Sequence, residues 1–229
     1  MATDRRRLDA SRFVWNPTGD PSRELERVAV FPYSIFFIRH GETSFNAEGR
    51  LQGQRDIPLN GKGREQASAV GRTLKKLMPT EIARLDAAEA FIASPLLRTR
   101  ETMDLARTAM GLAPRRYRLD PTLMELSFGD WEGLTWPEIE ARDPAGAAER
   151  EADRWNFVPP NGQSYAMLCD RLRPWLAARS GDVFVASHGG VARAFLALVA
   201  GVKPEIAAAI SIWQGRAIVF EKGGYRWVG

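Results

Sequence analysis

Two segments indicate the architecture of this chain: Ser34-Ile35-Phe36-Phe37-Ile38-Arg39-His40-Gly41 and Asp182-Val183-Phe184-Val185-Ala186-Ser187-His188-Gly189-Gly190. Each is a short apolar run that ends in histidine and glycine, and the 229 residues contain no other histidine. Continuous apolar runs of this length are typical of buried parallel strands. Ligands of an open parallel sheet bind beyond the carboxyl ends of its strands, so we expect both imidazoles in one site. The alternative is that each is an ordinary hydrogen-bonded histidine at the sheet margin.

Helical and strand patterns alternate along the rest of the chain. One apolar face recurs every three to four residues after Gly61, and a second short strand is expected over 89–93. Ser94-Pro95 has the form of a helix N-cap followed by proline, which predicts a helix over 95–110. Further elements are expected at 164–178 (helix), 183–187 (strand), 190–200 (helix) and 215–228 (hairpin). The pattern predicts an α/β three-layer sandwich with a mostly parallel central sheet flanked by helices and an antiparallel edge strand.

Two regions fall outside this alternation. Residues 1–33 are rich in turn-forming residues and predict an N-terminal arm ahead of a single domain over 34–229. Residues 121–163 hold several glycines and prolines between short helical stretches at 137–142 and 146–155, which is typical of a lid over the sheet crevice.

Composition excludes several classes of protein. Hydrophobic residues make up 45% of the chain, enough for one contiguous core. The formal charge is only +4, from 32 basic and 28 acidic residues, so we expect no nucleic-acid partner. No apolar run is long enough to span a membrane, no signal peptide is evident, and Cys169 has no partner for a disulfide. We therefore expect a cytoplasmic protein.

The residues around His40 suit phosphoryl transfer. A neutral imidazole is a competent nucleophile, and a covalent phosphohistidine divides a difficult transfer into two easier steps. Arginine forks match the oxygens of a phosphoryl group, so Arg39, Arg98 and His188 are expected to surround it. Arg98 and Arg100 lie near a helix N-terminus that disfavours cations, and a bound anion would resolve that conflict; the alternative is that both face solvent.

Five segments in order resemble the histidine phosphatase superfamily, the phosphoglycerate-mutase-like family of phosphotransfer enzymes. They are Arg39-His40-Gly41-Glu42-Thr43 with Asn46; Arg50 with Gln52-Gly53, Asp56 and Pro58-Leu59; Ser94-Pro95-Leu96-Leu97-Arg98; Glu125 with Gly129-Asp130-Trp131-Glu132-Gly133; and Ser187-His188-Gly189-Gly190. The similarity covers residues 34 to about 220. It implies a phosphoglycerate-mutase-like fold, a small phosphorylated substrate and no cofactor.

The resemblance also implies roles for individual residues. His40 would be phosphorylated, Arg39, Arg98 and His188 would complete the phosphate pocket, and Glu125 would donate the proton to the leaving group. Residues expected to contact the substrate are Thr43, Asn46, Gln52, Gly53 and Gly189. Arg100 should point elsewhere. Asp130 and Glu132 are rivals of Glu125, which we prefer because Leu123, Leu126 and Phe128 would partly desolvate it.

No metal is expected, because two histidines, one distant cysteine and no i, i+4 ligand pair do not form a zinc site. The sequence thus favours a metal-independent phosphomonoester hydrolase of the broad-specificity phosphatase branch. Mutases of the family have Arg and His directly after the donor Glu, whereas Leu126-Ser127-Phe128 follow Glu125 here. This difference disfavours a cofactor-dependent phosphoglycerate mutase, which is kept as the alternative. A catalytically weak phosphate-site binding module is a second alternative.

Several features leave the substrate and assembly open. Aromatic residues of the lid, such as Trp131, Trp136 and Trp155, would either line a leaving-group pocket or pack against one another. Arg50, Arg55 and Arg154 are candidates for a second anionic group, although arginines in loops are usually solvated. The long arm and Gln214, where the family suggests Asn, depart from the pattern and leave the oligomeric state open, with a homodimer as one option.

Overall fold

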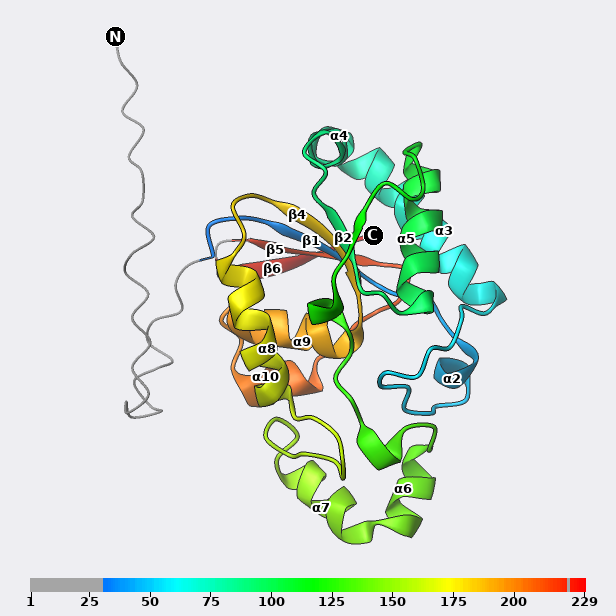
Figure 1. Cartoon of the computed structure of the whole chain (residues 1–229), viewed down its shortest axis with the longest axis vertical. Helices are drawn as coiled ribbons and strands as arrows, with labels where there is room; N and C mark the ends of the chain where they lie inside the picture. The colour runs from blue at the N-terminus through cyan, green and yellow to red at the C-terminus, as the bar shows by residue number, and fades with distance from the viewer. Residues whose placement is uncertain (1–30, 222) are drawn as a thin grey trace.

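The computed structural model describes residues 31–221 and 223–229. Six strands form one sheet in the order β3-β2-β4-β1-β5-β6 (Figure 1). Their bounds are β1 Ile35–Arg39, β2 Phe91–Ala93, β3 Arg118–Leu119, β4 Val183–Ser187, β5 Ala217–Glu221 and β6 Gly224–Val228. Strands β3, β2, β4 and β1 are parallel to one another, β5 is antiparallel to β1, and β6 is antiparallel to β5. The predicted mostly parallel sheet with an antiparallel edge is confirmed.

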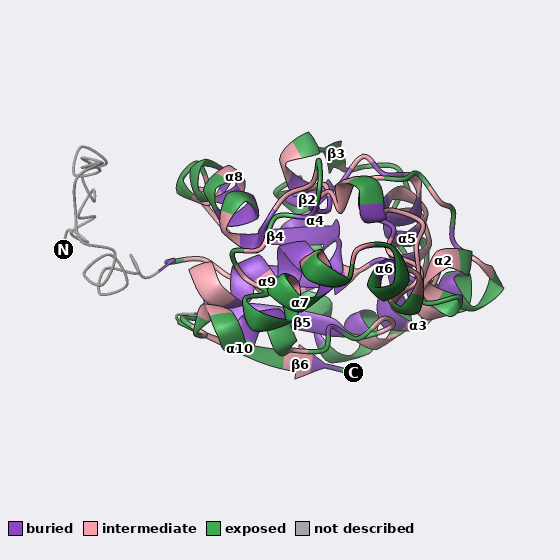
Figure 2. Ribbon diagram, turned by 90° about the horizontal axis from the view of Figure 1, so that it is seen from below, coloured by how far each residue is buried: buried purple, intermediate pink, exposed green. Residues whose placement is uncertain are grey.

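Helices cover both faces of the sheet. The helices are α2 Ser44–Ala47, α3 Gly61–Leu77, α4 Pro79–Ala87, α5 Leu97–Met110, α6 Trp136–Arg142, α7 Pro144–Ala152, α8 Tyr165–Ala177, α9 Gly189–Leu198 and α10 Pro204–Ala209. Alternate residues of β1 enter opposite layers: Ile35 and Phe37 pack with α8, α9 and α10, whereas Phe36 and Ile38 pack with α3, α4 and α5. Figure 2 shows the buried strands enclosed by helices whose outer faces are exposed. The three-layer sandwich is therefore the observed fold.

The helix after β2 begins later than its sequence suggests. The structure starts α5 at Leu97 with Leu96 as N-cap, not at Pro95 with Ser94 as cap. Ser94 is fully buried, and its Oγ lies 2.8 Å from Nε2 of His188. The predicted cap is wrong because a tertiary partner holds this hydroxyl.

Residues 121–163 begin in the main core, where Leu123 and Leu126 are buried, and then leave the sheet layers. They hold the short 3₁₀ turns Pro121–Leu123 and Gly129–Trp131 followed by α6 and α7, which lie at the lower end of Figure 1. α7 starts at Pro144 and not at 146, because Asp143 caps it through Gly146 N at 2.9 Å. Trp131, Ile139 and Ala147 form a small core of their own, with Trp136 and Phe157 packed against it. These lid aromatics therefore pack against one another.

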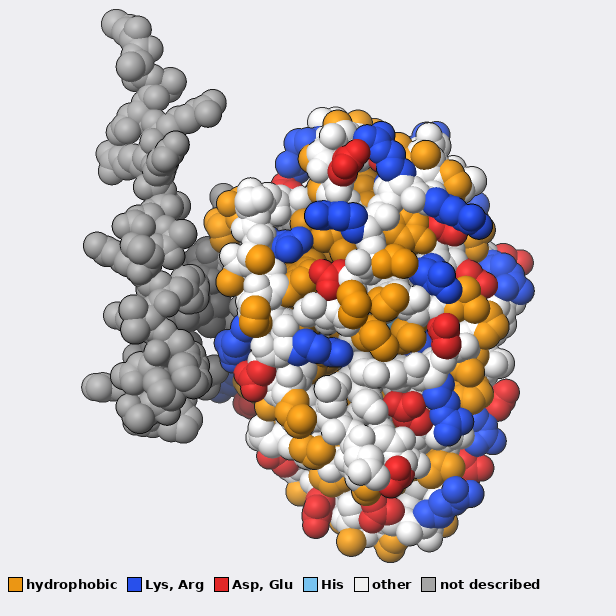
Figure 3. Space-filling model, viewed as in Figure 1, with side chains coloured by type: hydrophobic (Ala, Val, Ile, Leu, Met, Phe, Trp, Pro, Cys, Tyr) orange, Lys and Arg blue, Asp and Glu red, His pale blue; other side chains and the backbone are white. Residues whose placement is uncertain are grey.

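The remaining sequence features have simple outcomes. Cys169 lies on the buried face of α8, and no helix among the described residues is long and apolar enough to cross a membrane. Phe31 is buried beside Tyr33, and residues 1–30 of the arm predicted over 1–33 lie outside the described residues. Basic and acidic side chains are interspersed on the face that Figure 3 shows.

Candidate active site

The two histidines meet because their strands are neighbours. β1 and β4 pair in parallel with Arg39 opposite Ser187, and His40 N donates to Ser187 O at 2.9 Å. Both imidazoles are buried, with ring centroids 5.3 Å apart. The expectation that both lie in one site is met at the carboxyl ends of these strands.

Hydrogen bonding defines which nitrogen of His40 is free. Nδ1 lies 2.8 Å from the carbonyl oxygen of Gly41, and a carbonyl only accepts, so Nδ1 carries the proton. Burial, with Arg98 and Arg39 nearby, holds the pKa of His40 well below its usual range. The ring is therefore neutral at physiological pH, and its Nε2 lone pair is available as a nucleophile.

Gly41 is required at its position by close packing. Its N–H donates to Oγ1 of Thr102 at 3.0 Å, and a Cβ there would collide with the backbone of Gly63 at the start of α3. Oγ1 of Thr102 in turn donates to the carbonyl of Arg98 at 2.7 Å. This hydroxyl therefore links the loop after β1 to the first turn of α5.

Arg98 is fully buried, although the alternative placed it in solvent. Its Nη1 donates to Arg55 O at 2.7 Å and its Nη2 to Gly53 O at 2.8 Å, while its Nε has no partner among the described residues. Burial lowers the pKa of Arg98 to about 10, so the guanidinium is still charged at neutral pH. An unpaired charged donor in a buried site is costly unless a ligand engages it.

Arg39, the other arginine near His40, has a similar arrangement. Nη1 donates to Ile212 O at 2.8 Å, and the buried Nε has no partner among the described residues. Burial and then Arg193 lower the pKa of Arg39 to about 10. Nδ1 of His188 is a third buried nitrogen without a partner in the described part of the chain. Three unsatisfied nitrogens around one imidazole are suited to an anion.

Glu125 reaches this site from the start of the lid. Its Oε1 accepts from Leu126 N and its Oε2 from Gly190 N, each at 3.0 Å. Gly190 is the second residue of α9, two positions after His188, and a Cβ there would collide with Oε1 of Glu125. Arg171 on α8 holds the preceding carbonyl of Met124 at 2.7 Å, so backbone and side-chain contacts both position the carboxyl.

The rival carboxylates are engaged elsewhere. Asp130 is exposed and accepts from Nδ2 of Asn161 at 3.0 Å. Oε1 of Glu132 accepts from Gln54 N at 3.0 Å and from Phe128 N at 3.1 Å, so this side chain joins the loop at 53–54 to the lid. The geometry favours Glu125 over both.

Of the other predicted contact residues, Thr43 and Asn46 have local hydrogen-bond partners, whereas Oε1 of Gln52 has none among the described residues. Thr43 and Asn46 form the capping box of the short helix α2, and Oδ1 of Asn46 also accepts from Nε2 of Gln214 at 2.9 Å. Since Thr43 is fully buried in this cap, its hydroxyl serves local structure, whereas Nδ2 of Asn46 is left as a donor. Gln52 is buried and its Oε1 has no partner among the described residues.

Two glycines complete the predicted contact set. Gly53 has a left-handed φ of 51° and packs against the Glu132 side chain, while its carbonyl accepts from Arg98. A Cβ on Gly189 would lie 3.6 Å from Nε of Arg39. A side chain at that position would therefore stand over the donor that an anion needs.

The family model that matches this chain is the histidine phosphatase superfamily (branch 1), over residues 35–228. The chain belongs to this family. A glucosyl-3-phosphoglycerate phosphatase of Mycolicibacterium vanbaalenii is 33% identical over 181 residues, which cover 73% of this chain and 74% of that protein. A metal-independent phosphoserine phosphatase of Arabidopsis thaliana is 31% identical over 195 residues, which cover 82% of this chain and 74% of that protein. Probable phosphoglycerate mutases are also among the relatives.

A solved structure agrees with this histidine phosphatase fold. The mycobacterial glucosyl-3-phosphoglycerate phosphatase, solved with VO3, superposes with a TM-score of 0.68 and 26% identity. The superposition covers 85% of this chain and 96% of that one.

Within this histidine phosphatase, sequence reasoning did not predict the positions of three residues that contact the candidate site. Ser94 was assigned to a cap, and Thr102 carried no signal because it lies in an ordinary helix. Arg193 did carry one, since it is the single charged residue in the apolar helix α9. Among the described residues, no three His, Cys, Asp or Glu side chains gather as metal ligands.

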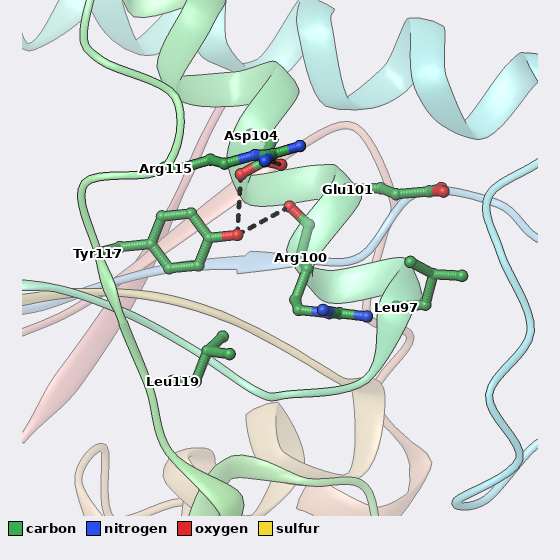
Figure 4. A pocket seen from close by; sticks show the side chains of 7 residues that line it. All are labelled: Leu97, Arg100, Glu101, Asp104, Arg115, Tyr117 and Leu119. Atoms are coloured by element: carbon green, nitrogen blue, oxygen red, sulfur yellow. Dashed lines mark hydrogen bonds and ion pairs between the residues drawn. The ribbon is translucent and has the colours of Figure 1, made fainter.

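A hollow of about 510 Å³ lies beside α5 but away from the histidines (Figure 4). Arg100 points into it, next to Tyr117, whose hydroxyl donates to Asp104 at 2.8 Å. Arg100 is thus directed elsewhere than Arg98, as expected for a residue two positions further along the helix. The hollow contains none of the groups around His40 and does not belong to the phosphatase site.

Proposed function

We propose that this protein hydrolyses phosphomonoesters of small metabolites without a metal, through a phosphohistidine at His40. The observation that carries the proposal is the set of buried nitrogens without a partner, Nε of Arg39, Nε of Arg98 and Nδ1 of His188, beside a neutral imidazole whose Nε2 is free. A phosphoryl group supplies the anionic acceptor oxygens that such donors need.

The first step forms the phosphoenzyme. Nε2 of His40 attacks phosphorus, the bond from phosphorus to the ester oxygen breaks, and the protonated carboxyl of Glu125 gives its proton to that oxygen. The leaving alcohol departs neutral, which matters because an alkoxide is a poor leaving group. Arg39 and Arg98 stabilise the charge on the equatorial oxygens.

The second step regenerates the enzyme. Glu125, now a carboxylate, takes a proton from water as the water oxygen attacks phosphorus and the bond from phosphorus to Nε2 breaks. Inorganic phosphate leaves, His40 is again neutral and Glu125 is again protonated. The cycle consumes one water and needs no metal, because the two guanidinium groups provide the positive charge.

A second fate of the phosphohistidine is transfer to another hydroxyl, as in a mutase. Leu126 is buried in the core, and the Ser127 hydroxyl donates to Oε1 of Glu132 at 3.2 Å, so the two positions directly after Glu125 offer no cation to a second substrate. This favours hydrolysis. A homodimer and a cytoplasmic location remain predictions, and light scattering of the purified protein would test the first.

The test is one assay in EDTA with wild type and His40→Ala on a panel of phosphomonoesters. The panel includes 3-phosphoglycerate primed with 2,3-bisphosphoglycerate, and both inorganic phosphate and 2-phosphoglycerate are followed. We expect phosphate release that requires His40, with a base-stable phosphoenzyme after quenching in wild type only. Faster appearance of 2-phosphoglycerate than of phosphate would establish a mutase. If folded wild type releases neither inorganic phosphate nor 2-phosphoglycerate and forms no phosphoenzyme, the result would favour the phosphate-site binding module.

A further inference from the structure

A second arginine stands beside the phosphate donors. Arg193 lies on α9 one turn beyond Gly189, and a Cβ on that glycine would lie 3.3 Å from Nη1 of Arg193 and 3.6 Å from Nε of Arg39. The two guanidinium groups therefore lie close to the same point above Gly189. Nε of Arg193 donates to Ile210 O at 3.0 Å, while Arg39 donates to Ile212 O, so one loop holds both.

The positive region continues into the lid, through Tyr165 and Trp155 to Arg150. Nη1 of Arg193 lies 3.5 Å from the hydroxyl of Tyr165, and the Trp155 ring stacks on the Tyr165 ring with centroids 5.4 Å apart. Arg150 of α7 lines the same depression as Tyr165 and Leu126, with its guanidinium 4.9 Å from the centroid of the Trp136 ring. Burial lowers the pKa of Arg150, and Arg193 is one of the charges that act in the same direction.

These two arginines lack the compensation that neighbouring arginines have. Arg154 pairs with Glu151 at 2.6 Å, and Arg50 pairs with Glu48 and Glu138 at 2.9 and 2.8 Å. In the described part of the chain, neither Arg193 nor Arg150 has a carboxylate within 4.0 Å. Like charges that converge without an acid between them favour binding of an anion.

We propose that Arg193, together with Arg150, binds a second anionic group on the substrate, so that the substrates are phosphomonoesters carrying a carboxylate or a second phosphate. This inference rests on the proposed phosphatase function, because the second group is placed relative to a phosphoryl group held at Arg39 and His40. Tyr165 supplies a hydroxyl next to Arg193, and the stacked Trp155 ring fixes its orientation. The site thus distinguishes doubly anionic esters from esters of neutral alcohols.

The test compares substrates that differ only in the second group. 3-Phosphoglycerate and glycerol 3-phosphate differ by a carboxylate in place of a hydroxymethyl group, and fructose 1,6-bisphosphate and fructose 6-phosphate differ by a phosphate. We expect wild type to prefer the doubly anionic member of at least one pair, which also identifies the second group. Arg193→Gln and Arg150→Gln should each reduce the ratio of the two kcat/KM values about 10-fold or more, the scale of one charge-assisted hydrogen bond.

Two controls distinguish an effect at this site from a general effect of protein charge and from an effect on the rate of hydrolysis. Arg72→Gln removes an exposed positive charge on α3 and should leave both ratios unchanged. Calorimetry on His40→Ala proteins, with and without Arg193→Gln or Arg150→Gln, gives dissociation constants for the same substrate pairs. These constants measure binding at the second site in the absence of turnover. Ratios unchanged in both arginine variants, by kinetics or by binding, would overturn the inference even if hydrolysis requires His40. Altered binding ratios without hydrolysis would overturn the proposed function alone.

Discussion

The imidazole rings of His40 and His188 lie with centroids 5.3 Å apart and planes inclined by 59°. Burial, together with Arg98, holds the pKa of both rings well below the usual value. Both rings are therefore neutral, and the positive charge of the pocket comes from the arginines. The pair therefore gives one neutral ring with a free Nε2, at His40, and one neutral ring that is hydrogen-bonded to Ser94, at His188.

Glu125→Gln tests the proton donor. The amide keeps an acceptor for one of the N–H groups of Leu126 and Gly190 but cannot supply an acidic proton, so kcat for alkyl phosphates should fall about 100-fold or more. p-Nitrophenyl phosphate, whose leaving group needs no proton, should lose much less. Steady-state kinetics on both esters make the measurement. Asp130→Asn is the matched control, and equal losses in the two variants would reject the assignment.

Gly190→Ala tests how the carboxyl is held. The added methyl group collides with Glu125 and with Leu126, so it displaces the carboxyl from the ester oxygen and should lower kcat about 100-fold. Gly181→Ala, where a methyl group meets nothing within 4 Å, should behave as wild type. Wild-type turnover in a folded Gly190→Ala protein would show that the position of Glu125 is unimportant.

Ser94→Ala tests the orientation of His188. Oγ of Ser94 accepts weakly from Leu96 N at 3.4 Å, so its proton is available for Nε2 of His188, which places the ring proton on Nδ1 as a donor to phosphate. Loss of this hydroxyl should reduce kcat/KM about 10-fold and weaken inhibition by inorganic phosphate. His188→Ala sets the lower limit. If Ser94→Ala leaves the inhibition constant unchanged, the hydroxyl does not orient the ring.

The pH dependence of stability tests the burial of neutral histidine. Both folded-state pKa values are depressed, so below about pH 6.5 the unfolded chain binds protons that the folded chain does not, and the free energy of unfolding should decrease. Above that pH this contribution to stability is fully present. Urea titrations on both sides of pH 6.5, on wild type and His188→Gln, make the measurement. The variant should show the shallower dependence, and identical slopes would contradict the prediction.

The sequence alone determined the strands that directly precede His40 and His188, the helix along Ala67, Val70 and Leu74, and the parallel sheet to which both strands belong. Apolar periodicity carries this information because each residue's burial follows from its place in a local repeat. Because β1 and β4 are parallel neighbours, their pairing is sufficient to bring the two histidines together. Arg98 was predicted as a phosphate ligand because its motif is contiguous in the sequence.

Tertiary structure alone decided the contacts between segments distant in the chain. The helix α4 and the two-residue strand β3 carry little periodicity, and Ser94 resembles a cap in every local respect. Only the folded chain shows that Ser94 faces His188, and that Arg193 rather than Arg50 or Arg154 lacks an acidic partner. A charge's partner depends on which loops pack together, and that depends on the whole set of long-range contacts rather than on neighbouring residues.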